Sequence, residues 1–129
     1  MTKSIESLKI NEQSDLPGGK MVCQQEAIHL AERLKYQKDS IVSQEIYSRE
    51  MGTLTLFAFD QGQQLSEHTA PFDAFVFCLE GQVEVTIEGQ AHQLKAGELI
   101  LMPAHKPHAL QALTPFKMLL IMFRSASQE

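Results

Sequence analysis

The chain has 129 residues, 43% of them hydrophobic, which fits a single domain with its own core. Sixteen Asp and Glu outnumber eleven Lys and Arg, and this net charge of −5, without any cluster of basic residues, argues against a nucleic-acid partner. The N-terminus lacks the apolar core of a signal peptide and no window approaches the roughly twenty apolar residues of a membrane span, so we expect a cytoplasmic protein with no membrane partner.

The first part of the chain differs in composition from the rest. Residues 1–23 are mostly polar and contain the turn signal Pro17-Gly18-Gly19, so we expect a loosely attached N-terminal arm. The stretch 24–35 places apolar residues at the i, i+3, i+4, i+7 spacing of one helical face (Ala27, Leu30, Ala31 and Leu34). This spacing predicts a short N-terminal helix.

Short β-type runs follow the predicted helix, and Gly or Pro separates almost all of them. Regularly spaced short strands favour an all-β sandwich or barrel over alternating βαβ units. We therefore predict one β domain over residues 24–129, with its core at 40–123. The predicted strands are 40–48, 53–60, 74–80, 82–88, 91–96, 98–103, 108–113 and 116–123.

The predicted strands differ in how their apolar residues are arranged. Residues 82–88 alternate between Val83, Val85 and Ile87 on one face and polar residues on the other, which is typical of a strand with one wet side. The runs AFVFCL and MLLIMF are apolar on both faces and so need a second covering layer. That layer is either the N-terminal segment or another subunit, and we expect a homodimer.

Glycine, histidine and proline recur at fixed gaps in two parts of the chain. Gly62 precedes His68 by five residues, and Gly97 precedes Pro103 by five residues. The full set is Gly62, His68, Gly81, Gly97, Pro103 and His108. This is the spacing of the two cupin motifs, so the chain resembles the small single-domain cupins over roughly residues 40–123. The resemblance implies a jelly-roll β-barrel (double-stranded β-helix), usually dimeric, with an interior divalent metal on three His and one Glu.

Two of the four family ligand positions keep a histidine, His68 and His108. Four positions depart from the family pattern, namely Ala70 for the second His, Ala74 for the Glu, His105 for the Gly of motif two and Ala112 for its Asn. First-row metals at imidazole sites take three or more protein ligands, so a metal site here would need at least one further ligand in place of the missing family ligands.

Three nearby side chains are alternative ligands. Asp73 and Glu67 each lie one residue from a family ligand position, and side chains alternate faces along a strand, so we expect both carboxylates to face away from the interior. His105 adds an imidazole three residues before His108, but histidine is also enriched at the positive φ values that a glycine turn requires. We regard His105 as the less favoured third ligand.

The same parity that directs position 74 inward also directs Val76 and Cys78 inward. The spacing of Cys78 and Cys23, with no CxxC pair, favours reduced thiols. No Lys or Arg lies near Cys78 in sequence to lower its pKa, so we expect a buried pocket-wall residue and not a nucleophile. The predicted ligand pocket is therefore lined in part by His68, Val76, Cys78 and His108.

These residues support two classes of function. The leading hypothesis is a barrel whose interior pocket binds a small molecule, with a metal site that is reduced to two histidines and is weak or absent. The alternative is a metal-dependent oxygenase or isomerase in which His68 and His108 hold Fe, Mn, Ni or Zn. A structural or interaction role is a third reading, supported only by the strands that are apolar on both faces.

Overall fold

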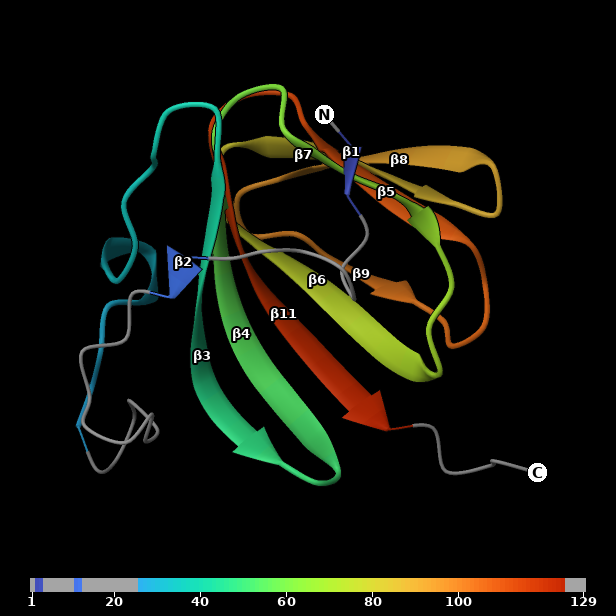
Figure 1. The fold of residues 1–129 in the computed structure, drawn as a ribbon, viewed down its shortest axis with the longest axis horizontal. Coiled ribbons are helices and arrows are strands. Elements are labelled where there is room, and N and C mark those ends of the chain that lie inside the picture. The colour runs from blue at the N-terminus through green and yellow to red at the C-terminus, as the bar shows by residue number, and fades with distance from the viewer. Residues whose placement is uncertain (1, 4–10, 13–25, 125–129) are drawn as a thin grey trace.

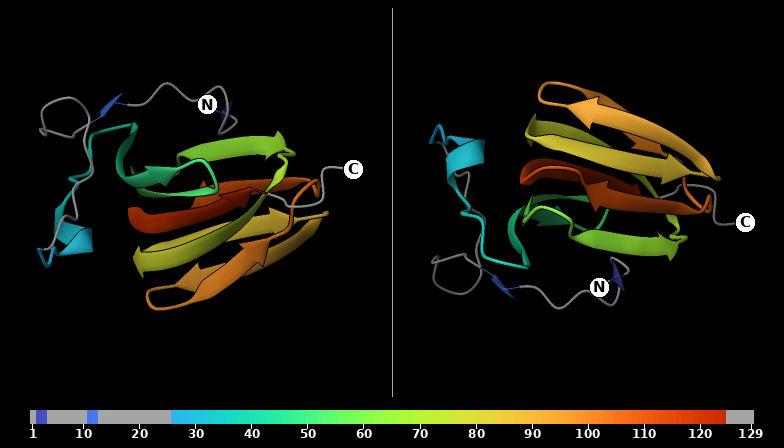
Figure 2. Two further views of the ribbon diagram at one scale, coloured as in Figure 1. Left: turned by 90° about the horizontal axis from the view of Figure 1, so that it is seen from below. Right: turned by 90° about the horizontal axis from the view of Figure 1, so that it is seen from above.

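The fold consists of two β-sheets that face one another, as Figures 1 and 2 show. The structure, a computed structural model, describes residues 2–3, 11–12 and 26–124. Among these residues the elements are β1 (Thr2–Lys3), β2 (Asn11–Glu12), η2 (Leu30–Glu32, a 3-10 helix), β3 (Ile41–Arg49), β4 (Gly52–Phe59), β5 (Gln64–His68), β6 (Phe72–Glu80), β7 (Gln82–Ile87), β8 (Gln90–Lys95), β9 (Leu99–Met102), β10 (His108–Ala112) and β11 (Phe116–Arg124).

The strand order is that of a jelly-roll barrel. One sheet has the order β1-β5-β10-β7-β8, and the other, which we call the large sheet, has the order β2-β3-β4-β11-β6-β9. The pairs are antiparallel except for β1 with β5 and β2 with β3, which are parallel. The all-β prediction is confirmed, and each predicted strand corresponds to one observed strand. Strand β5 was not predicted separately.

The predicted helix over 24–35 is not found in its described part, residues 26–35, which contains only the 3-10 turn η2. The residue before this turn, His29, has an extended backbone with φ of −91° and ψ of 102°, which interrupts helical geometry inside the predicted span. Ile28, Leu30 and Leu34 pack instead on the outer face of the large sheet. Tertiary packing thus overrides the helical spacing, because these side chains reach the sheet from an irregular backbone.

A polar cluster fixes this segment to the sheet. The ammonium of Lys117, on β11, donates to the carbonyl of Ala31 and lies 3.7 Å from the Glu80 carboxylate. The Tyr36 hydroxyl donates to the same carboxylate, and the Lys117 ammonium lies 4.9 Å from the centre of the Tyr36 ring. Burial and the negative Glu80 raise the pKa of Tyr36 well above its usual value, so this phenol stays protonated.

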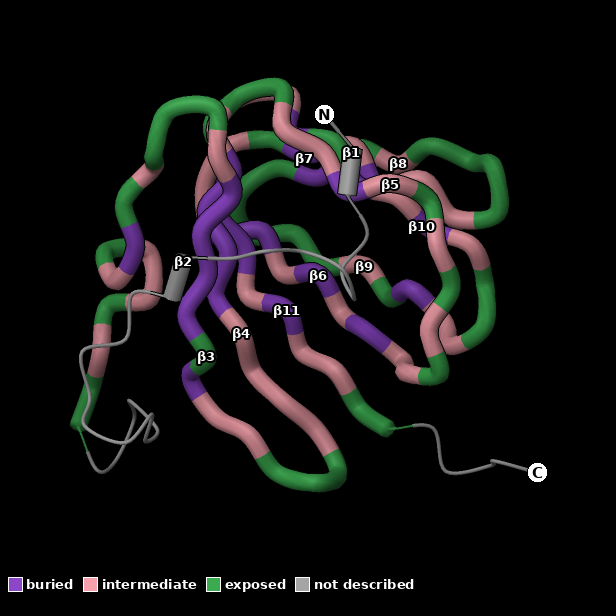
Figure 3. Tube along the Cα trace, in the orientation of Figure 1, coloured by how far each residue is buried: buried purple, intermediate pink, exposed green. Residues whose placement is uncertain are grey.

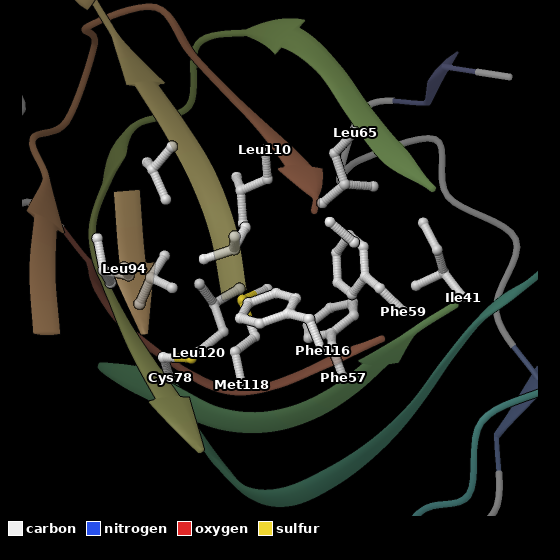
Figure 4. Packing of buried hydrophobic residues seen from close by; sticks show 14 of the residues in the cluster. Ile41, Phe57, Phe59, Leu65, Cys78, Leu94, Leu110, Phe116, Met118 and Leu120 are labelled. Atoms are coloured by element: carbon white, nitrogen blue, oxygen red, sulfur yellow. The ribbon is translucent and has the colours of Figure 1, made fainter. Parts of the chain in front are cut away.

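The main core lies between the two sheets. Figure 4 shows Leu65 and Leu110 of one sheet facing the aromatic rings of the large sheet. The rings of Phe59 and Phe116 meet edge to face with centroids 5.2 Å apart. Val83 and Val85 are fully buried, so the alternation predicted for residues 82–88 is confirmed.

The outer face of the large sheet is covered over only part of its area. Figure 3 shows buried stretches of β3 and β4 near the preceding segment, whereas the β3–β4 hairpin tip and the end of β11 are exposed. The expected covering layer is therefore present in part and comes from residues 28–36. Four large apolar side chains stay exposed, and we call them the outer strip: Met51, Leu99, Leu101 and Phe123.

Most of the predicted arm, residues 1–23, lies outside the described residues. Its two described pieces, β1 and β2, pair with β5 and β3 through Thr2 opposite Gln64 and Asn11 opposite Val42. Within the part of the chain that the structure describes, no helix has the length and apolar character needed to cross a membrane.

Candidate functional site: a histidine pair at one rim of the barrel

Two short connections bring the candidate residues to one end of the barrel. His68 is the last residue of β5, and residues 69–71 then cross to β6 in the large sheet. Residues 103–107 make the reverse crossing, from β9 to β10, whose first residue is His108. The two crossings are bonded to each other, because the His105 amide donates to the Ala70 carbonyl at 2.8 Å. We call this end of the barrel the histidine rim.

The two imidazoles lie side by side at this rim. His68 and His108 are register partners across β5 and β10, and their ring centroids are 4.5 Å apart at an interplanar angle of 71°. The ladder between β5 and β10 is irregular here, with a register shift between His108 and Leu110. Such a bulge reorients side chains, and it allows His68 to meet His108 despite the odd spacing from Leu65.

Backbone hydrogen bonds set the orientation of each ring. The Nδ1 atom of His68 lies 2.9 Å from the Ser66 carbonyl, and that of His108 lies 3.0 Å from the Lys106 carbonyl. A carbonyl oxygen only accepts, so each Nδ1 carries the proton and donates. In a neutral ring with this tautomer the lone pair is on Nε2, which is the arrangement found in histidines that bind metals. His108 is 2% exposed, and Nε2 of His68 is buried.

The inner face of the large sheet is apolar around Ala74. Ala74 on β6, the family Glu position, has Met102 of β9 and Met122 of β11 as register partners on either side. Ala74 and Met102 belong to the interior core, and Met122 packs against it. Thr53 follows Met122 in the same row across β4, and its buried hydroxyl has no hydrogen-bond partner among the described residues.

The alternative ligands have other roles. Asp73 lies on β6, and its carboxylate accepts a hydrogen bond from the Ala104 amide at 2.9 Å, in the crossing from β9 to β10. His105 is exposed with a φ of 68°, as expected for a histidine at a glycine position in a turn. Glu67 is exposed.

The described residues do not fit the family's metal set. No group of three or more His, Cys, Asp or Glu side chains within residues 26–124 is placed to hold one ion. Two neutral imidazoles supply no negative charge, and the carboxylate position is occupied by the methyl group of Ala74. A divalent ion held by three His and one Glu is therefore not matched by this donor set.

Val76 and Cys78 point into the interior, as strand parity predicts. Both are fully buried members of the core. The thiol of Cys78 lies within hydrogen-bond distance of the Gly81 carbonyl, with the sulfur 3.4 Å from the oxygen. Burial, with a smaller effect of the Glu98 carboxylate, raises the pKa of Cys78 to about 11, so the thiol is protonated at neutral pH. This environment opposes a nucleophilic role.

Sequence reasoning missed the two methionines at the rim. Counting alternate positions from Ile100 along β9 and from Leu120 along β11 would have placed both on the inward face, but the pairing of β6 with both strands was needed to set them beside Ala74. The pairing of His68 with His108 also depends on β5, which the residue pattern did not delimit.

Two facing sheets of mostly antiparallel strands, with paired histidines at one rim, define a jelly-roll barrel protein. Residues 55–122, more than half of the chain, match the family described as Cupin domain. The chain belongs to the cupin family, as the motif spacing predicted.

Solved structures agree with this assignment. A conserved protein of unknown function from Streptococcus pyogenes is 30% identical with a TM-score of 0.78, over 84% of this chain and 95% of that chain. A cupin superfamily protein from Desulfitobacterium hafniense is 26% identical with a TM-score of 0.76, over 82% and 97%. A cupin 2 conserved barrel domain protein from Leptotrichia buccalis is 38% identical with a TM-score of 0.73, over 75% of this chain and 47% of that longer chain. A search of curated proteins finds no match.

Proposed function

We propose that this cupin binds a small organic molecule at the histidine rim and that its affinity for divalent metal is weak. The observation that carries this proposal is the pair of imidazoles 4.5 Å apart, facing a wall where alanine occupies the family's carboxylate position. The pair offers two nitrogen acceptors, and Thr53 offers a buried hydroxyl. Val76 and Cys78, which follow Ala74 inward along β6, form the apolar floor of the site.

This combination suits a ligand with an apolar body and one or two hydrogen-bond donors. Small-molecule sites are mostly apolar, with a few polar groups that fix orientation. A neutral Nε2 accepts a hydrogen bond from a hydroxyl or a protonated acid, and burial of His108 strengthens that bond relative to water. Small phenols and enols are therefore the class of ligand that we favour.

A titration monitored by nuclear magnetic resonance tests this proposal. Small phenols and carboxylic acids are added to isotope-labelled protein, and the ring Cε1–H signals of the histidines are followed. We expect the signals of His68 and His108 to shift in a saturable way, while those of exposed His29 stay fixed. His68→Ala should weaken binding and keep the fold. Equal shifts at all histidines, or collapse of the barrel in His68→Ala, would contradict the assigned role.

A metal-dependent enzyme is the second candidate. It is favoured by one observation, that each Nδ1 atom lies within hydrogen-bond distance of a backbone carbonyl, which is the tautomer-fixing contact common in metal-binding histidines. Fe, Mn, Ni or Zn would then need a chelating substrate to complete its coordination, because the protein supplies two ligands. Activity that requires added divalent metal and disappears on chelation would support this candidate, and activity that survives chelation would refute it.

We also propose that the protein is a cytoplasmic homodimer that associates through the outer strip. Leu99 and Leu101 lie on β9, the edge strand of the large sheet in the described residues, and are 54% and 39% exposed. An uncharged, exposed edge strand pairs readily with its own copy about a two-fold axis. The rings of Phe75 and Phe123 meet edge to face beside it, 6.3 Å apart. The reduced thiol of Cys78 fits the cytoplasm.

A further inference from the structure

We propose that the histidine rim is a site for a soft monovalent metal ion, Cu(I), held by His68 and His108 together with the thioethers of Met102 and Met122. This inference rests on the location of the site in the proposed function and names a ligand class for it. These donors do not fit the divalent ion of the family, and the two register partners of Ala74 indicate which ion they would fit.

Strand register places both methionines next to the lost carboxylate position. Met102 pairs with Ala74 from one side and Met122 pairs with Ala74 from the other. Side chains of paired residues lie on the same face of a sheet, and Ala74 faces the interior with 4% exposure. The two thioethers therefore flank the position from which a glutamate would reach a metal.

Chain connectivity brings these methionines to the level of the histidines. Met102 is the last residue of β9 and His108 the first of β10, so one five-residue crossing joins them. His68 is separated from the start of β6 by only residues 69–71. The hydrogen bond from the His105 amide to the Ala70 carbonyl holds the two crossings together. The imidazole pair and the methionine pair thus lie at the same end of the barrel, on opposite sheets.

The chemistry of these donors favours a soft ion of low charge. Thioethers are soft ligands that select Cu(I), and imidazole also suits copper. The site carries no carboxylate to neutralise a second positive charge, and burying a divalent ion among apolar side chains is more costly than burying a monovalent one. Methionine is also a poor ligand for Mg, Ca and Mn, which prefer oxygen. Replacing the carboxylate ligand by two thioether ligands therefore changes the metal ion that the site prefers.

The test is an anaerobic titration of untagged protein with Cu(I) in competition with the chromogenic chelator bicinchoninate. Cys23→Ala protein is the starting variant, so that this thiol does not compete. We expect one Cu(I) per chain, with affinity lowered roughly tenfold or more by Met102→Leu and by Met122→Leu. Leu preserves the volume of Met, so the fold is kept. X-ray absorption of the loaded protein should show sulfur as well as nitrogen neighbours of copper.

The matched control is Met118→Leu, also on β11 and fully buried but paired with Cys78 deeper in the core. We expect its Cu(I) affinity to change by less than about twofold. Unchanged affinity in both Met102→Leu and Met122→Leu would overturn the proposal, as would loss of binding in Cys78→Ala alone, which would identify the thiol as the ligand. If Cu(I) does not bind but phenols still shift the His68 and His108 signals, only this inference fails. If neither binds, the proposed function fails as well.

Discussion

Gly81 separates β6 from β7, and its backbone lies close to the backbone of Pro115 and Phe116. Substitution of Gly81 tests this close approach, which helps to position β7 next to β10, the strand that carries His108. Gly81 has a φ of +80°, and a Cβ added there would lie 2.0 Å from the Pro115 carbonyl oxygen and 2.8 Å from Cα of Phe116. Gly89 is the matched control, because its φ is +83° but no atom lies within 4 Å of an added Cβ. The two variants therefore share backbone strain and differ in steric overlap.

The difference between the two variants follows from these distances. The left-handed conformation costs an alanine about 1–2 kcal/mol, offset by about 0.4–1 kcal/mol because alanine has less freedom when unfolded. We thus expect Gly89→Ala to lower the free energy of unfolding by about 1 kcal/mol. In Gly81→Ala the Pro115 backbone must also move by about 1 Å to reach a tolerable contact, and such overpacking adds about 1–3 kcal/mol.

Urea denaturation at 25 °C, followed by circular dichroism, measures both values. We expect Gly81→Ala to be less stable than Gly89→Ala by about 1–3 kcal/mol, with the same dependence on urea concentration. A difference below about 0.5 kcal/mol would refute the close approach of the Gly81 turn to the strand that begins at Phe116.

Four further results are expected. Cys78 should resist iodoacetamide in folded Cys23→Ala protein at pH 8.5 and react on unfolding, because a pKa of about 11 leaves about 0.3% thiolate at that pH. Mass spectrometry of the intact chain measures the extent of alkylation. If the folded protein reacts as fast as the protein in urea, Cys78 is not buried. The raised pKa also means that the thiol stabilises the fold below pH 9 and that this contribution is lost as the pH rises toward 11. Lys117→Met should lower the free energy of unfolding by about 1–2 kcal/mol, because Glu80 loses its cation and the covering segment loses a hydrogen bond; hydrogen exchange that is unchanged across residues 28–36 would count against the contact. Leu101→Lys should convert the expected homodimer into a monomer in sedimentation experiments, and a wild-type mass of one chain at micromolar concentration would refute the dimer.

Patterns formed by residues close together in the sequence predicted the strands and the fold class well. The alternation of Val83 and Val85 and the glycines between strands delimit the elements without knowledge of the pairing. The helix predicted around Leu30 was wrong, because apolar residues at helical spacing can also pack on a sheet from an irregular backbone. Only the tertiary contacts of Leu30 and Leu34 distinguish the two.

The site could be predicted only in part for a related reason. The spacing of the motifs identifies His68 and His108 as a pair, and strand parity places Cys78 in the core, while the Asp73 carboxylate bonds to the Ala104 amide. Which side chains face the pair depends on the pairing of β6 with β9 and β11. That pairing joins residues far apart in sequence, so Met102 and Met122 could not be recognised from local pattern.

Elemental analysis of untagged protein, purified without chelator or nickel resin and then incubated with Fe, Mn, Ni and Zn salts, tests the central claim most directly. If the histidine rim has exchanged a divalent metal site for an apolar binding site, each of these metals should remain well below one mole per mole of chain after desalting. Near-stoichiometric divalent metal that is lost in the His68→Ala/His108→Ala double variant would contradict the account and would make the metal-dependent enzyme the better description.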